Sequence, residues 1–270
     1  MSIIVSVKIN DGIVMAADSA LAFFYPTGGA GQIYQHATKI MNLVKGLPIG
    51  VMTCGSGSVG AASVDTLLKD LRGRLSAGGE DALDPGTYTL ASVAGAVGRF
   101  FSEKAAAADF KLFLLLRVCG YSSGEDLPEV WQVGVGGGAS DEPICAQQRE
   151  EIGPRWNGEL DAMDRLLLGI PPHLVDSLVK EGLLAPGGSD LAIPRLVPHV
   201  SVPMILPAAP IQDAIDLARF MVETTIGFIR FAIDRPKTVG GAVEIASITK
   251  HEGFKWVQRK HFYPRDLNVA

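Results

Sequence analysis

The first seventeen residues carry the clearest pattern of apolar and polar positions in the chain. Residues 3–9 alternate between apolar and polar side chains with a period of two, which predicts a strand with one buried face. Ile4 interrupts the alternation, so we expect the second face to be covered as well. Asn10-Asp11-Gly12 predicts a hairpin turn, because these residues tolerate the positive φ of tight primed turns. The apolar run Ile13–Ala17 then predicts a second strand that ends at Asp18.

The same kind of pattern predicts alternating groups of strands and helices along the rest of the chain. Short apolar runs bounded by turn residues predict strands at 39–44, 47–54, 111–119, 129–135, 144–148, 242–249 and 254–262. Apolar residues at helical spacing predict helices at 64–75, 87–101, 159–168, 174–184 and 211–233. We expect the glycine-rich segment 23–31 to form a mobile loop anchored by its aromatic residues. This order of elements is typical of an α+β protein with layered sheets.

The segment 185–210 differs from the rest because prolines alternate with apolar residues throughout it. Proline removes a backbone donor and blocks a central strand, so we expect an extended arm rather than a regular element. A disordered linker would be more polar. The segment is therefore expected to lie ordered against a surface, either of its own subunit or of a neighbour.

Composition and charge narrow the classes of function. The 270 residues include 47% hydrophobic and 20% charged positions, which suits a globular chain with a sizeable core. The net charge of -5 and the lack of a basic run argue against nucleic-acid binding. No apolar stretch approaches the length of a membrane span, and the N-terminus lacks the pattern of an export signal. We expect a cytoplasmic protein without a membrane partner.

No pattern predicts a cofactor or a metal. The glycines of 134–138 are not followed by a predicted helix, as a dinucleotide-binding loop would require. The three cysteines and five histidines show no metal-ligand spacing and no disulfide framework. Residues 54–58 lack the partners of a nucleophile elbow and are better explained as turn residues.

The N-terminal pattern resembles that of proteasome β-type subunits and their bacterial relatives, which are N-terminal-nucleophile hydrolases. The resemblance rests on Ser2, the Asp11-Gly12 turn, Ala16-Ala17-Asp18-Ser19, Thr38-Lys39-Ile40 and Gly50-Val51-Met52-Thr53-Cys54-Gly55, in that order. It implies one domain over residues 1–270, folded as a four-layer αββα sandwich, with the proline-rich segment 185–210 as an insertion. It also implies homo-oligomeric rings, a peptide or protein substrate, and an unfoldase as a candidate partner.

The resemblance also implies roles for individual residues once Met1 is removed. The Ser2 hydroxyl is the nucleophile and its own α-amine is the general base. Lys39 favours a neutral amine through its charge, and Asp18 holds Lys39 in place. Backbone N–H groups at Cys54 and Gly55 are the candidates for the oxyanion hole.

The sequence departs from the family pattern in its later segments. The family uses an Asp and a Ser just before a Gly-Gly pair, whereas this chain has Asp234 displaced, Val239 in the serine position, and Thr238 as the nearest hydroxyl. A second assisting serine is missing from 152–158, the nucleophile is serine rather than threonine, and Cys54 stands where a smaller residue is expected.

Three hypotheses for function follow from the site and its departures. The first is an N-terminal-serine peptidase enclosed in a ring. The second is a non-catalytic scaffold or binding protein with the same fold. Taken one at a time, a serine at position 2 can be without a role, Asp18 can cap a turn and Lys39 can be a solvated lysine. The third keeps the chemistry and takes a small amide as substrate.

Overall fold

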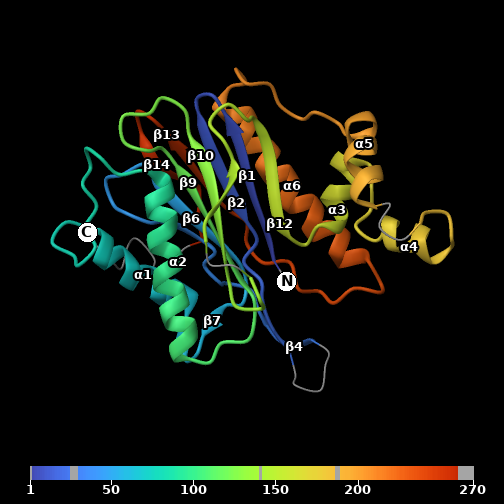
Figure 1. The fold of residues 1–270 in the computed structure, drawn as a ribbon, viewed down its shortest axis with the longest axis horizontal. Helices are drawn as coiled ribbons and strands as arrows, with labels where there is room; N and C mark the ends of the chain where they lie inside the picture. The colour runs from blue at the N-terminus through green and yellow to red at the C-terminus, as the bar shows by residue number, and fades with distance from the viewer. Residues whose placement is uncertain (1, 25–29, 140–141, 186–188, 261–270) are drawn as a thin grey trace.

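A computed structural model describes residues 2–24, 30–139, 142–185 and 189–260. Two five-stranded antiparallel sheets lie face to face at its centre (Figure 1). The first sheet has the order β12 (Gly153–Gly158), β1 (Ile3–Ile9), β2 (Gly12–Ala17), β13 (Glu244–Thr249) and β14 (Gly253–Gln258). The second has the order β11 (Ile144–Gln147), β10 (Glu129–Val135), β9 (Leu114–Gly120), β6 (Ile49–Gly55) and β5 (Ile40–Asn42).

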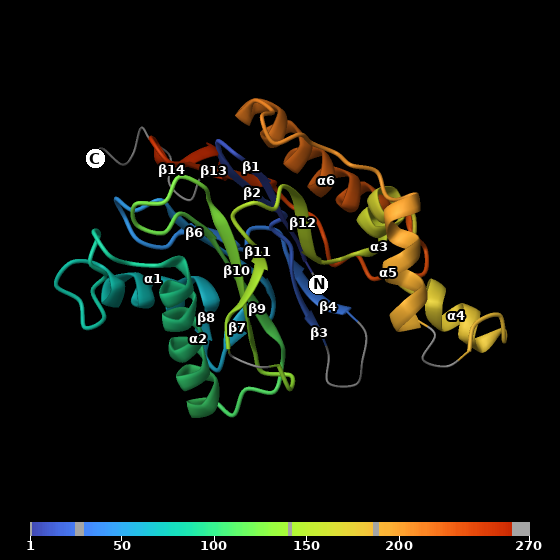
Figure 2. The same cartoon turned by 45° about the horizontal axis from the view of Figure 1, so that its top comes forward.

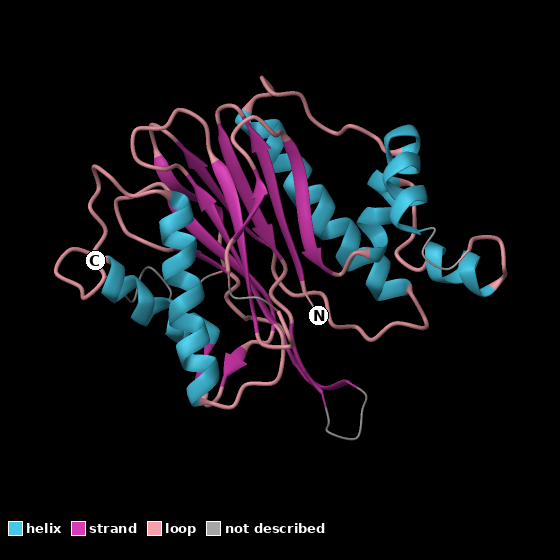
Figure 3. Cartoon of the chain, viewed as in Figure 1, coloured by secondary structure: helices cyan, strands magenta, loops and turns pink. Residues whose placement is uncertain are grey.

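Helices cover the outer face of each sheet, as Figure 3 shows by colour. Against the second sheet pack α1 (Val64–Leu75) and α2 (Leu90–Ala107), whose apolar faces form one core with β6, β9 and β10. Against the first sheet packs α6 (Ile211–Phe231), together with α3 (Asp161–Met163) and the π-helical turn Asp164–Leu168. A third core lies between the two sheets. The four-layer αββα sandwich is therefore confirmed.

The first hairpin forms as predicted, but not through the predicted turn geometry. Every residue of β1 and β2 is buried, as the interrupted alternation at Ile4 indicated. Asn10, Asp11 and Gly12 all keep negative φ, so the expected positive-φ turn is wrong. Gly12 is needed for space instead, because a Cβ there would collide with the backbone oxygen of Ile248 on β13.

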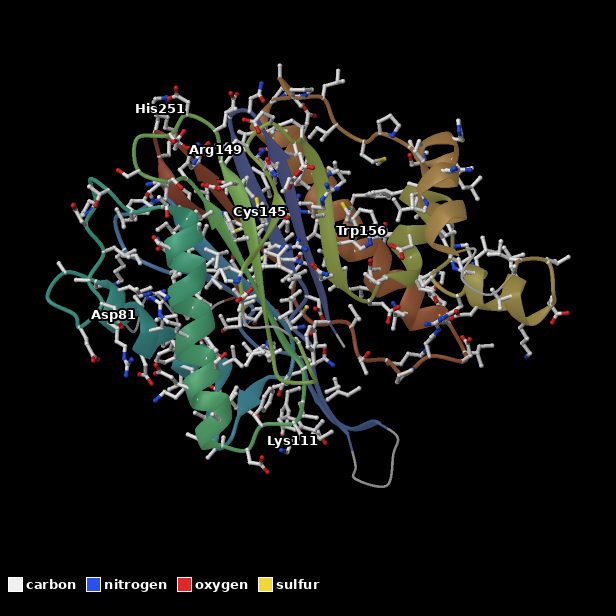
Figure 4. The ribbon with its side chains drawn as sticks, in the orientation of Figure 1. Asp81, Lys111, Cys145, Arg149, Trp156 and His251 are labelled. Atoms are coloured by element: carbon white, nitrogen blue, oxygen red, sulfur yellow. The ribbon has the colours of Figure 1, made fainter. Side chains whose placement is uncertain are left out.

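The sequence patterns missed strand β12. It pairs with β1, placing Pro154 opposite Val7. Its proline and glycines resemble a turn in the sequence, but β12 is an edge strand, where a missing backbone donor is tolerated. Figure 4 shows Trp156 on the side of β12 next to α3, and its Nε1 donates to Oδ1 of Asp164 at 2.8 Å.

The segment 23–31 was predicted to be a loop, yet its described ends belong to the strands of a hairpin. The strands β3 (Leu21–Phe24) and β4 (Ala30–Tyr34) pair antiparallel, and residues 25–29 between them lie outside the described part. The rings of Phe23 and Tyr34 meet edge to face at 5.8 Å. The hairpin projects from the end of the sandwich at which β1 begins (Figure 2). The last predicted strand likewise ends early, at Gln258, and residues 261–262 are not described.

The expectation of an extended arm over 185–210 is wrong for its first half. After the short helix α4 (Leu174–Lys180), the helix α5 (Ser189–Val200) contains Pro194 and Pro198. The two prolines are four residues apart and both exposed, so water can reach the carbonyls that they leave without a donor.

The second half of this segment, residues 201–210, is extended and packs on its own subunit. Val202 N–H donates to the oxygen of Leu167 at 2.8 Å, and Pro207 accepts from Asn10 N–H at 3.0 Å. Met204 and Ile205 pack against the core beneath α6.

Candidate active site

Asp18 is the centre of the candidate site. It follows β2 and is fully buried. Its Oδ1 accepts hydrogen bonds from the backbone N–H of Ile3 at 2.9 Å and from Nζ of Lys39 at 2.6 Å. Its Oδ2 accepts from the N–H groups of Ala20 at 3.1 Å and Gly240 at 3.0 Å. A buried carboxylate with these partners is compensated, and it ties four separate segments together.

Lys39 lies just before β5 and is 5% exposed, so it is a buried lysine and not a solvated one. Burial lowers the pKa of Lys39, and the charge of Asp18 opposes that shift. The ammonium is consequently a desolvated charge with one direct carboxylate partner. Such a charge acts more strongly on nearby titrating groups than a lysine in water does.

Ser2 is held in place by hydrogen bonds of the peptide group that joins it to Ile3. Its carbonyl oxygen accepts from Glu159 N–H at 2.7 Å, and the next N–H, that of Ile3, binds Asp18. Gly158 stands opposite Ile3 with φ of 98°, and a Cβ there would collide with the Ser2 oxygen. Two features of Gly158, its conformation and its lack of a side chain, thus permit this close approach.

Ser2 and Lys39 line one cleft of about 230 Å³. The end of β6 forms another wall with Thr53, Cys54 and Gly55. The remaining lining residues come from the start of β3, the segments before β5 and after β6, and the start of α1, and they are Leu21, His36, Ala37, Thr38, Ser56, Gly57, Ser63, Val64 and Asp65. The structure therefore brings together Ser2, Lys39, Cys54 and Gly55, and it places Asp18 directly behind Lys39.

The wall around Cys54 has distinct chemical properties. Burial raises the pKa of the Cys54 thiol to about 11, so the thiol stays protonated at neutral pH and is a poor nucleophile. Gly55 has φ of 101°, and a Cβ there would collide with the oxygen of Phe113. That same oxygen accepts from Ser56 N–H at 2.8 Å, so this N–H is already occupied.

Asp234 and Thr238, the predicted assisting residues, do not line this cleft in the described part of the chain. The Asp234 side chain is 83% exposed and lies 3.9 Å from Nε of Arg235. Thr238 is buried, but its hydroxyl points to the oxygen of Pro236 at 3.4 Å. This segment reaches the site through a backbone group instead, the N–H of Gly240.

Sequence reasoning missed two buried cations near the site. Arg117 on β9 lies between the sheets, where Nη1 donates to Ser6 Oγ and to the Arg155 oxygen, both at 2.9 Å. Lys260 pairs with the buried Glu244 beside Ser19. Arg117 sits in a run of apolar residues and Lys260 next to Arg259, so neither has a pattern that marks it as buried.

No protein-family model matches the sequence, and no curated protein matches it. Solved structures match over nearly the whole length. Anbu (ancestral beta-subunit) from Yersinia bercovieri has a TM-score of 0.58 at 15% identity, covering 96% of this chain and 88% of that one. Anbu from Pseudomonas aeruginosa, solved as a helical assembly, has a TM-score of 0.59 at 16% identity, with 97% and 88% covered.

This chain has the Anbu fold. A third match, to Anbu from Hyphomicrobium sp. strain MC1, has a TM-score of 0.55 at 13% identity and covers 98% of this chain and 91% of that one. The likeness to proteasome-type subunits inferred from the N-terminal residues is therefore confirmed for the fold. None of the helices in the described ranges is both long and apolar enough to cross a membrane. Those ranges also contain no cluster of three or more metal-ligating side chains.

Proposed function

We propose that this Anbu-like protein is an N-terminal-serine amide hydrolase, with peptides as its substrates. The observation that supports this most is the buried Asp18–Lys39 ion pair beside Ser2 in a cleft. Two charges removed from water are expensive to keep in a fold, and such groups concentrate at functional sites. A solvated Lys39 does not agree with its burial, and Asp18 binds the Lys39 ammonium in addition to capping the turn at Ala20.

The proposed mechanism begins when removal of Met1 gives Ser2 a free α-amine. The neutral amine takes the hydroxyl proton as Oγ attacks the substrate carbonyl. The Lys39 charge disfavours the protonated amine, so more of the base is available near neutral pH. Backbone N–H groups at Cys54 and Gly55 are the candidates to bind the oxyanion. Expulsion of the amine product leaves an ester on Ser2, which water then hydrolyses.

A non-catalytic scaffold remains the second candidate, because specific observations favour it. Thr238 directs its hydroxyl to Pro236, Asp234 lies in solvent, and no serine is present in β12. If these missing hydroxyls are essential, the ion pair would serve only to fix the ends of β2 and β5. The third hypothesis, a small-amide substrate, shares the proposed chemistry and differs from the first only in substrate.

The deciding experiment is intact mass spectrometry after incubation with an electrophilic peptide probe. We expect a protein lacking Met1 to gain one probe mass, mapped to Ser2. Ser2→Ala is the matched control, and it should gain none while keeping its far-UV spectrum. An unlabelled wild-type protein that is folded and lacks Met1 would favour the scaffold.

We also propose a cytoplasmic homo-oligomer, either a ring or the open helical form named for the Pseudomonas relative. The support is a group of exposed apolar side chains at the C-terminal end of α6, where Phe228 is 38% exposed, Phe231 is 77% exposed and Ile233, just after the helix, is fully exposed. Such a surface is typical of subunit contacts. Light scattering tests the assembly, and Phe228→Glu/Phe231→Glu should reduce the particle mass.

A further inference from the structure

Lys260, two residues after the end of strand β14, lies beside the candidate site. Lys260 follows β14 and is 7% exposed at its side chain. Its Nζ lies 2.7 Å from Oε2 of Glu244, which is 1% exposed. The same ammonium donates to the backbone oxygen of Ala37 at 2.9 Å and to Oγ of Ser19 at 3.3 Å. This is the second buried lysine–carboxylate pair at this end of the sheets.

The partners of Lys260 belong to the segments that carry the first pair. Ser19 follows Asp18, and Ala37 precedes Lys39 by two residues. Ala37 N–H also donates to the Ser19 oxygen at 2.9 Å, so the two segments are already in contact. Lys260 therefore links the segment around Asp18 to the segment around Lys39, and the Asp18–Lys39 ion pair links the same two segments a second time.

Glu244 is placed by the sheet itself. It opens β13 and stands opposite Ala17, the residue before Asp18. Ser19 is bound to the segment just before β13. Its hydroxyl donates to the backbone oxygen of Ala242 at 2.6 Å, and its N–H donates to the backbone oxygen of Gly240 at 2.9 Å. The backbone of Glu244 is thus fixed by the sheet, and its buried carboxylate is the negative group that the Lys260 ammonium meets there.

A buried ion pair is weak evidence for a stabilising role, because desolvation offsets the attraction. An apolar pair in this place would hold the segments together without charge. The positive charge of Lys260, however, acts on Lys39 in the candidate site. Burial is the main cause that lowers the pKa of Lys39, and the charge of Lys260 adds to that lowering.

We propose that Lys260, held by Glu244, is a positioning residue for the Ser2 site: it fixes the Asp18 and Lys39 segments to each other and adds positive charge behind them. The inference rests on the proposed function. The charged and titratable groups that face this part of the site in the described chain are Asp18, His36, Lys39, Cys54, Asp65, Arg117, Glu244 and Lys260.

The test measures the rate at which the peptide probe labels Ser2, as a function of pH, in wild type and four variants. Lys260→Met removes a positive charge, so the pKa of the Ser2 amine should rise. The acidic limb of the profile of labelling rate against pH should then move to higher pH. Glu244→Gln removes a negative charge and should move the limb to lower pH. We expect shifts of about half a pH unit in opposite directions. A purely structural role would not produce opposite signs.

The labelling rate at pH values above the acidic limb, where the rate no longer changes with pH, reports how well the site residues are positioned, separately from the effect of charge. Lys260→Met should lower it roughly tenfold or more, because small displacements in a site cost large factors in rate. Lys260→Arg, which keeps the charge and the donors, should restore most of the rate and the wild-type limb. Lys255→Met is the matched control, because Lys255 is an exposed lysine on β14, and it should change neither.

Should Lys260→Met fail to fold because Glu244 is left unpaired, the double variant Glu244→Gln/Lys260→Met removes both charges. It should fold, keep a limb near that of wild type, and retain the loss in plateau rate. Normal labelling of wild type with an unchanged rate and limb in the folded Lys260 variants overturns this inference alone. Wild type that is not labelled at Ser2 overturns the proposed function, and this inference with it.

Discussion

Replacing Lys39 by Met breaks the Asp18–Lys39 pair from one side and tests whether the pair is buried as the structure has it. The methionine is close in length to the lysine stem, so the change removes the charge with little loss of volume. Asp18 would keep its three backbone N–H donors but lose the ammonium at 2.6 Å. Because Lys39 is buried, we expect the change to lower the stability of the protein as well as its activity.

The magnitude follows from the burial of both partners. Removing one partner of a buried pair costs about 3–5 kcal/mol, and an exposed pair costs about 1 kcal/mol or less. We expect the lower end, about 3 kcal/mol, because the backbone donors still compensate Asp18. For a chain of this size that corresponds to a fall in Tm of roughly 6–12 °C.

The assay is urea unfolding followed by circular dichroism, together with probe labelling of Ser2. Lys69→Met is the control, because Lys69 forms an exposed pair with Asp65 at 2.6 Å. The double variant Asp18→Asn/Lys39→Met removes both charges and should recover much of the lost stability without recovering labelling. A Lys39→Met variant that is no less stable than Lys69→Met would refute the burial argument.

The same pair gives a pH dependence with a definite sign. Because the pKa of Lys39 is lowered in the folded state, the unfolded state binds more protons between that lowered value and 10.5. Wild type should therefore gain stability relative to Lys39→Met as the pH rises through this window. Urea midpoints at several alkaline pH values measure the difference, and a difference that narrows would contradict the direction assigned to Lys39.

Three further predictions follow from the site and the fold. Mature protein should lack Met1, since the proposed base exists only on a free Ser2, and intact mass measures this directly. Cys54 should react with iodoacetamide about a hundredfold more slowly than an ordinary thiol at neutral pH, since the pKa of Cys54 is raised to about 11; rapid labelling of folded protein would contradict its burial. Replacing residues 201–210 by a Gly/Ser linker should lower the Tm of the protomer, because Met204 and Ile205 pack in its own core; an unchanged Tm with a smaller particle would instead place the segment against a neighbouring subunit.

The parts of the fold that the sequence predicted are those in which local pattern and tertiary packing agree. The alternation of residues 3–9, the helical spacing in α2 and α6, and the antiparallel order of β9 to β11 all appear as expected. Strand β12 could not be predicted, because its proline and glycines have turn propensity and only its place at the sheet edge makes them acceptable. Helix α5 is hidden for a related reason, since prolines argue against a helix unless they share an exposed face.

The residues of the candidate site also differ in whether the sequence could predict them. Ser2, Asp18 and Lys39 could be named because their segments resemble those of proteasome β-type subunits, and each lies in or beside an element that the local pattern predicts. Lys260 and Gly240 could not, because their contributions depend on contacts across more than 200 residues of sequence. A backbone N–H also has no sequence signature at all. The expectation for Asp234 and Thr238 treated a side chain as necessary where the structure supplies a main-chain donor.

This reliance on backbone groups bears on how one fold can accommodate sequences that are only 13–16% identical. Three of the four groups that bind Asp18 are main-chain N–H groups, and Ser2 is fixed through its carbonyl oxygen. Main-chain contacts constrain conformation and leave most side chains free, apart from glycines such as Gly158 where a Cβ would collide. The residues that must be kept for the geometry are therefore few: the acid, the lysine that pairs with it, and the glycines that allow close approach. Substitutions elsewhere can then change the surface of the protein while leaving this arrangement of main-chain contacts in place.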